Sequence, residues 1–129
     1  MTDCGGRVSR GRAAYASQFR LPEGKAVEEL KRVVGERMAN EAINAAGGAW
    51  VDDCLSLRDR SLVVLAALVT QGGVEERLRG HVRWAVDHGV TPEELEAMGS
   101  LLAVYVGYQR ASVVMETIRE VLSGEGEGG

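Results

Sequence analysis

The sequence predicts an all-α protein, built as a single-domain helical bundle, and three observations support this fold class. Apolar residues recur at steps of three and four along most of the chain, which is the spacing of one face of an α-helix. Glycines interrupt this pattern at positions that suit helix ends. The sequence has no strand pair joined by hairpin turn chemistry, and it has no repeat of fixed period.

Both ends of the chain are expected to be flexible. Residues 1–24 carry arginines among Gly and Ser without an apolar period, so they bury too little surface to offset the entropy lost on ordering. We interpret this segment as a basic N-terminal arm. Residues 123–129 are rich in Gly and Glu and are interpreted as an acidic tail. The helical domain is therefore expected to span residues 25–122.

Two helices are predicted in the first half of this domain. From Lys25, apolar residues keep to one face until Gly47-Gly48, where the helix is expected to end. Ser56 followed by Asp59 resembles the start of a capping box and begins the second helix. From Leu62 to Val69 this second helix is apolar nearly all round, which indicates burial on most sides. We expect it to be the central helix.

Three further helices are predicted in the second half. An amphipathic helix follows Gly72-Gly73 and stops at Gly89, a residue suited to the left-handed position after a helix. Thr91 to Glu94 then supply a hydroxyl cap, a proline in the first helical position and a returning carboxylate, which together mark a helix start. That helix is expected to end or kink at Gly107. A last amphipathic helix reaches Leu122.

Composition and charge argue against several classes of function. The formal net charge is −4, and no predicted helix carries a dense Lys/Arg run, so we expect no nucleic-acid partner. No apolar stretch reaches the roughly 18–20 residues of a membrane span, and no hydrophobic segment follows the N-terminal arginines. We therefore expect a cytoplasmic protein that does not enter membranes. Cys4 and Cys54 are expected to be free thiols.

Metal and nucleotide motifs are absent from the sequence. It contains no HExxH, no EF-hand loop and no CxxC. The glycine pairs Gly47-Gly48 and Gly72-Gly73 have neither the Walker spacing nor a preceding strand. We expect no metal and no cofactor.

Imidazole chemistry is restricted to His81 and His88. His81 lies three residues after Leu78 and four before Ala85, so it borders the buried stripe of its helix, where desolvation can tune its pKa. It is either a catalytic acid/base or a structural histidine in a helix contact. His88 lies beside Gly89 in the last turn, where a cation stabilises the helix end.

Two guanidinium groups, those of Arg58 and Arg60, lie at the predicted start of the central helix. A guanidinium matches a carboxylate in shape and charge, so either side chain can hold an acidic substrate. Pairing with Asp52, Asp53 or nearby glutamates is the other interpretation.

Four segments form an ordered set along the chain. They are Arg60-Ser61-Leu62-Val63, Leu78-Arg79-Gly80-His81-Val82-Arg83-Trp84-Ala85, Gly89-Val90-Thr91-Pro92-Glu93-Glu94-Leu95 and Tyr105-Val106-Gly107. Together they resemble the pattern of the gamma-carboxymuconolactone decarboxylases, over about residues 25–122. Trp50 falls where that family often carries tryptophan.

The resemblance implies an all-α fold of the carboxymuconolactone decarboxylase and alkylhydroperoxidase D-like type. It also implies a homotrimer or homohexamer and cofactor-independent chemistry on small carboxylated lactones, of the kind found in bacterial aromatic catabolism. The alkylhydroperoxidase D branch uses a CxxC pair, but the matching positions here hold Val74 and Arg77. Without thiols a dithiol peroxidase is excluded.

The chain departs from the family at positions that usually carry acid–base groups. Ala97 replaces a carboxylate, Leu101 replaces a histidine, and Arg77 replaces an acidic residue four positions before the histidine. Gln109 stands where a proline usually follows the tyrosine motif. Decarboxylation of a lactone acid needs a proton delivered to carbon, so His81 would have to donate it or use water.

We therefore expect a cofactor-independent lyase for a small carboxylated or lactone substrate, with His81 as acid/base. Arg60 or Arg77 would hold a carboxylate or enolate oxygen, and Trp50 and Tyr105 would form pocket walls. One alternative is a non-catalytic ligand-binding or assembly protein on the same fold. The other is a cyclase or isomerase of specialised metabolism with a largely apolar pocket.

Overall fold

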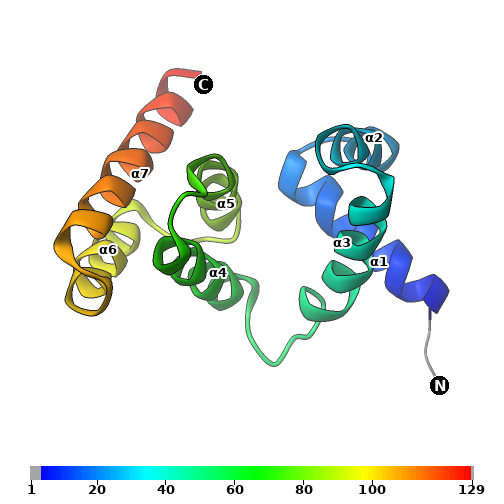
Figure 1. Ribbon diagram of the computed structural model, residues 1–129, viewed down its shortest axis with the longest axis horizontal. Coiled ribbons are helices and arrows are strands. Elements are labelled where there is room, and N and C mark those ends of the chain that lie inside the picture. Colours follow the sequence, from blue (N-terminus) through cyan, green and yellow to red (C-terminus); the bar gives the residue numbers. More distant parts are fainter. Residues whose placement is uncertain (1–3, 129) are drawn as a thin grey trace. The chain divides into compact units, whose positions relative to one another are not determined.

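The protein is all-helical, as predicted (Figure 1). In the computed structural model the backbone is described for residues 4–128 and the side chains for residues 6–124. The helices of this range are α1 (Cys4–Phe19), α2 (Glu23–Val34), α3 (Glu36–Ala49), α4 (Leu57–Gln71), α5 (Glu75–Asp87), α6 (Pro92–Val106) and α7 (Tyr108–Gly128).

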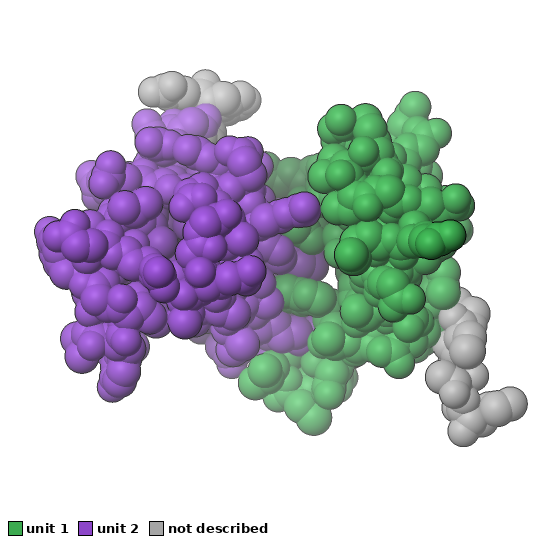
Figure 2. Space-filling view, in the orientation of Figure 1, with its two compact units in different colours: residues 1–55 green, residues 56–129 purple. Residues whose placement is uncertain are grey.

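The helices form two compact units rather than the single domain expected over residues 25–122. Unit 1 is Met1–Leu55 and unit 2 is Ser56–Gly129, shown in different colours in Figure 2. Helices α1, α2 and α3 pack together in unit 1, and α4, α5, α6 and α7 pack together in unit 2. The boundary falls in an exposed stretch around Cys54 that belongs to no helix.

The prediction of a flexible arm at residues 1–24 was wrong for most of its length, because Cys4–Phe19 form α1; Met1–Asp3 lie outside the described residues. Helix α1 packs on α3 through small residues instead of a stripe of large apolar ones. A Cβ added to Gly11 would lie 1.8 Å from the Ile43 carbonyl oxygen, and one added to Gly47 would lie 1.8 Å from the Arg7 carbonyl oxygen. The two backbones therefore touch only because both positions are glycine.

Arginines of α1 contribute to this packing as well. The Arg7 Nε donates to the Asn44 carbonyl at 2.8 Å, and the Arg10 Nε donates to the Gly47 carbonyl at 3.4 Å. The Gly47 carbonyl lies in the last turn of α3, where carbonyl groups lack helical partners. Two of the arginines that we assigned to a flexible basic arm thus form contacts between α1 and α3.

The single helix expected from Lys25 to Gly47 is two helices, α2 and α3. Gly35 separates them, with a φ of 85° that glycine adopts at low cost. The apolar period continues across this break, which is why the sequence pattern did not reveal it. The buried residues Val27, Leu30, Ala39 and Ile43 make the core of unit 1, with Tyr15 and Phe19 packed against it.

Helix α4 begins where the sequence predicted. The Ser56 hydroxyl accepts a hydrogen bond from the Asp59 N–H at 3.0 Å, and Gly72 ends the helix with a φ of 72°. The expectation that α4 is buried on most sides was wrong. Leu65 and Val69 are buried, but Val63 on another face is 59% exposed, because the helices of unit 2 cover only one side of α4.

The core of unit 2 lies among α4, α5, α6 and α7. Its members are Leu65, Val69, Leu78, Val82, Ala85, Val90, Leu95, Val114, Ile118 and Val121. Within α4, α5 and α7 they recur at three- and four-residue steps, so each of these helices offers one apolar face to the core. Leu95 comes from α6, and Val90 lies in the turn before it.

Helix α6 has both halves of the predicted capping box. The Thr91 hydroxyl accepts from the Glu94 N–H at 3.1 Å, and the Glu94 carboxylate accepts from the Thr91 N–H at 2.9 Å. The helix continues through Leu101 to Val106 and ends at Gly107, as predicted. Helix α7 differs from the expectation of a tail after Leu122, because it runs on to Gly128; Gly129 lies outside the described residues.

Within the described residues, no helix is long and apolar enough to cross a bilayer.

Candidate functional site

His81 lies on α5, beside the face that packs into the core of unit 2. Leu78, Val82 and Ala85 of the same helix are buried, and His81 itself is partly buried between those turns. Its ring centroid lies 5.9 Å from that of Trp84, at an interplanar angle of 53°. The indole is 3% exposed, so the imidazole borders an apolar surface.

These surroundings keep His81 neutral. Burial, together with the smaller effect of the positive charge of Arg77, lowers the pKa of His81 to about 4. At pH 7 only about one ring in a thousand is then protonated. A neutral imidazole has one acceptor nitrogen and one N–H donor, so His81 is suited to accept a proton and unsuited to donate one unless a ligand raises its pKa.

His88 lies about two turns further along the same side of α5, as the cap of that helix. Its Nδ1 is 2.7 Å from the Ser61 Oγ, and its ring centroid is 4.9 Å from that of Trp84. Burial lowers the pKa of His88; Asp87 raises it, Arg60 lowers it, and a hydrogen bond to the Leu57 backbone raises it.

His88 therefore connects two helices, instead of stabilising the end of α5 as a cation. Hydrogen bonds to Ser61 and to the Leu57 backbone join the end of α5 to the first turns of α4. Sequence reasoning missed Ser61, although it lies within the Arg60-Ser61-Leu62-Val63 segment. Its hydroxyl-to-imidazole contact bridges 27 residues of sequence, so no local pattern reveals it.

The two candidate arginines lie near different histidines. The charge of Arg77 acts on His81, whereas the charge of Arg60 acts on His88. Both histidines contact Trp84 on one side of α5. We call the group His81, Trp84 and His88 the α5 imidazole face.

The residues predicted as pocket walls belong to other helices than α5. Tyr105 lies in the last turn of α6 with its side chain 78% exposed. Trp50 is the cap of α3 and belongs to unit 1, whereas the α5 imidazole face belongs to unit 2. Of the residues predicted to bind substrate, Arg77 is the one whose charge acts on His81.

Arg58 takes part in ion pairs, which is one of the two roles that the sequence suggested for it. Its guanidinium bonds to Glu94 and, at 3.2 Å, to Asp59. The partners therefore come from the α6 capping box and the first turn of α4, not from Asp52 or Asp53. Arg58 thereby ties the start of α4 to the start of α6.

Cys54 is a free, exposed thiol. Hydrogen bonding to Asp52 raises its pKa, with the negative charge of that carboxylate adding to the effect. A raised pKa leaves less of the nucleophilic thiolate. Among the described residues, no group of three His, Cys, Asp or Glu side chains is placed to hold a metal ion.

Comparison with known proteins gives two matches. The sequence model of a family described as "Carboxymuconolactone decarboxylase family" matches residues 38–120. A protein of Acinetobacter baylyi named 4-carboxymuconolactone decarboxylase is 34% identical over 77 residues, which are 60% of this chain and 57% of that protein. The chain thus spans less than two thirds of this relative. No solved structure matches the chain.

Proposed function

Because this chain belongs to the carboxymuconolactone decarboxylase family, we propose that it is a cofactor-independent lyase that decarboxylates a small carboxylated lactone, with His81 as its acid/base. The 34% identical decarboxylase supports the reaction class. The observation that carries the assignment to His81 is its desolvated imidazole beside the charge of Arg77. Strongly shifted pKa values of this kind are typical of acid–base groups in active sites.

The proposed reaction breaks one carbon–carbon bond and forms one carbon–hydrogen bond. As the substrate carboxylate leaves as carbon dioxide, the bonding electron pair moves through the conjugated system onto the lactone carbonyl oxygen. The enolate that results is stabilised by the positive charge of Arg77. A proton from His81 then reaches carbon, and water restores the proton to the imidazole.

Substrate binding prepares His81 for this step. Before binding, burial and the charge of Arg77 disfavour the imidazolium. A bound carboxylate brings a negative charge that offsets Arg77 and raises the pKa of the ring. His81 thus becomes an effective acid only when the anionic substrate is present.

The test replaces His81 with alanine and measures turnover of 4-carboxymuconolactone. We expect kcat to fall by about 10²- to 10⁴-fold, since that is the usual contribution of one acid/base group. Arg83→Gln is the matched control, because Arg83 is exposed on the same helix and is expected to leave turnover unchanged. Circular dichroism and sedimentation show whether both variants keep fold and assembly. Full activity of a folded His81→Ala protein contradicts the mechanism.

We further propose that the chain works as a homotrimer or homohexamer. An apolar stripe on α6 and the start of α7 supports self-association. Leu101, Val104, Tyr105 and Tyr108 are 61%, 77%, 78% and 72% exposed. Leu101, Val104 and Tyr105 follow helical spacing and lie on one side of α6, and Tyr108 follows directly after the break at Gly107. Apolar groups exposed in this way are typical of protein interfaces. We call these four residues the α6 stripe.

One alternative function is that of a non-catalytic protein with the same fold. The α6 stripe includes Leu101 in the position where the family usually has a histidine, and Ala97 one turn earlier is also an exposed position without an acid–base group. This favours an assembly protein that binds ligands without turning them over. Binding of a carboxylated lactone with no product formed by the wild type would support this alternative.

A further inference from the structure

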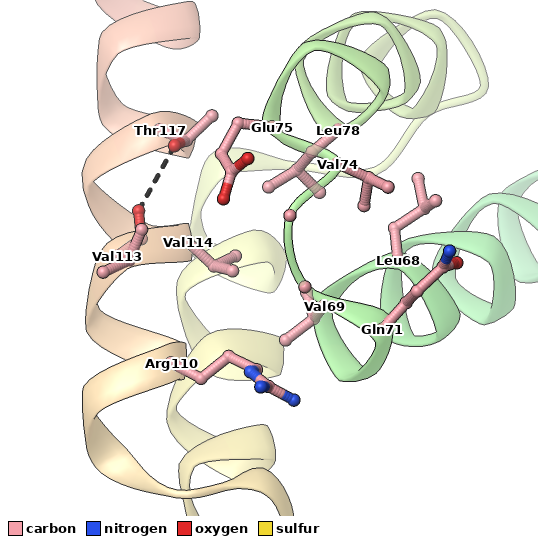
Figure 3. Close-up of a pocket in the computed structure, with 12 residues that line it drawn as sticks. Leu68, Val69, Gln71, Val74, Glu75, Leu78, Arg110, Val113, Val114 and Thr117 are labelled. Atoms are coloured by element: carbon pink, nitrogen blue, oxygen red, sulfur yellow. Dashed lines mark hydrogen bonds between the residues drawn. The ribbon is translucent and has the colours of Figure 1, made fainter.

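A cavity of about 230 Å³ lies in unit 2 (Figure 3). It is lined by the C-terminal end of α4, the Gly72-Gly73 turn, the first residues of α5 and one side of α7. His81, Arg60, Arg77 and Tyr105 are not among its lining residues. On α5, Glu75 lies about 120° around the helix from His81, and Leu78 lies about 120° around it from Trp84.

The wall of this cavity is apolar. Val69, Leu78 and Val114 are buried core residues that border it, with exposures of 1%, 3% and 6%. Leu68, Val74 and Val113 complete the apolar lining. A surface of this kind binds hydrocarbon groups by removing them from water.

A guanidinium lies at one end of the cavity. The Arg110 Nη1 donates to the Thr70 carbonyl at 2.6 Å, which anchors the side chain. A Cβ added to Gly72 would lie 3.4 to 3.5 Å from the Nε, Cζ and Nη2 of Arg110, so the guanidinium rests against that glycine. Arginine has five N–H donors, and the bond to Thr70 uses one of them.

The charge of Arg110 is not neutralised by an acidic side chain among the described residues, whereas the charges of Arg79 and Arg119 are. Arg119, which is on α7 like Arg110, pairs with Glu96 at 2.8 Å. Arg79 of α5 pairs with Glu120 at 2.6 Å. Figure 3 shows Glu75 and Thr117 at the end of the cavity remote from Arg110. A negative ligand group is thus attracted to the Arg110 end and repelled from the other.

We propose that this cavity is a binding site for a compact monocarboxylate, with its carboxylate on Arg110 and its apolar body against Val69, Leu78 and Val114. The volume is below the roughly 300–1,000 Å³ of pockets for drug-sized ligands, so the ligand has about the size of a single ring. A guanidinium binds a carboxylate through paired N–H donors, which orients the ligand. The site is separate from the proposed catalytic centre and does not depend on it.

Benzoate is the probe, and benzamide is the neutral control of the same shape. We expect benzoate to bind the purified full-length protein in calorimetry and to raise its melting temperature, and benzamide to bind far more weakly. Arg110→Gln is expected to weaken benzoate binding by about ten- to a hundredfold, since it removes a charged hydrogen-bond donor. Arg119→Gln is the matched control on the same helix and should bind as the wild type does.

A second variant keeps the test decisive if Arg110→Gln destabilises the fold. Val113→Trp places a large side chain at a half-exposed position of the lining and is expected to abolish binding by filling the cavity. His81→Ala should bind benzoate with unchanged affinity, even if it abolishes turnover. The proposal is overturned if benzoate does not bind, if benzamide binds as well, if Arg110→Gln retains affinity, or if His81→Ala loses it.

Discussion

Two histidines lie on the same side of α5, and their surroundings give them different roles. His88 contacts the Ser61 hydroxyl at 2.7 Å and holds two helix ends together. His81 lies against Trp84, and the nearby charge is the positive one of Arg77. An imidazole so placed costs free energy to protonate, which makes His81 sensitive to any negative ligand group.

The shifted pKa of His81 predicts a pH dependence of stability. Between pH 6.5 and about 4, His81 is protonated in the unfolded chain but remains neutral in the folded chain. The free energy of unfolding therefore falls as the pH is lowered through this window. The contribution of His81 to this loss is at most about 3 kcal/mol by pH 4. The pKa of His88 is also lowered, so its effect has the same sign.

Urea titrations at pH 7 and pH 4.5 measure this effect, and His81→Gln isolates its source. The variant removes the titrating ring and should flatten the pH dependence relative to the wild type. Arg77→Gln should raise the pKa of His81 as followed by NMR, whereas Arg83→Gln should not. An unchanged pH dependence in His81→Gln would contradict the burial of this imidazole.

At the scale of elements, glycine decides how closely α1 approaches α3. An added Cβ at Gly47 would meet the Arg7 carbonyl oxygen, which is backbone and cannot rotate away. Gly47→Ala is expected to lower the free energy of unfolding of unit 1 by about 1–3 kcal/mol, the usual cost of overpacking. Urea unfolding measures this, and faster proteolysis near the exposed Arg20 would report the release of α1.

Gly24→Ala is the control for the Gly47 experiment. Gly24 lies on α2 with nothing within 4 Å of an added Cβ, and its φ is not positive. Alanine there should stabilise the helix by about 0.5–1 kcal/mol. If both substitutions had the same effect, close backbone packing would not be what holds α1 in place.

At the scale of the whole molecule, the α6 stripe is expected to form the contact between subunits. Val104→Glu puts a charge in the middle of this apolar surface and is expected to dissociate the proposed homo-oligomer, since burying an unpaired carboxylate is costly. Asn40→Glu adds the same charge at an exposed polar position of α3 and should leave assembly intact. Sedimentation velocity measures both, and a wild type that sediments as a monomer would contradict the proposal.

Several parts of the fold were predictable because their causes lie within a few residues of sequence. The caps at Ser56 and at Thr91 with Glu94, and the stop at Gly107, depend on side chains that bond to their own backbone. The family could be inferred as well, since its motifs are short ordered segments. The position of His81 beside a buried helical stripe followed from the same spacing.

The surroundings of each candidate residue were decided only by the tertiary structure. Burial, the proximity of Arg77 to His81 and the Ser61 contact of His88 depend on how helices pack, and packing joins residues far apart in the chain. The docking of α1 escaped prediction for the same reason, because Gly11 and Gly47 act through a close approach that no periodic pattern of large apolar residues encodes. Local bonding thus determined where helices begin and end, and long-range packing determined what their side chains meet.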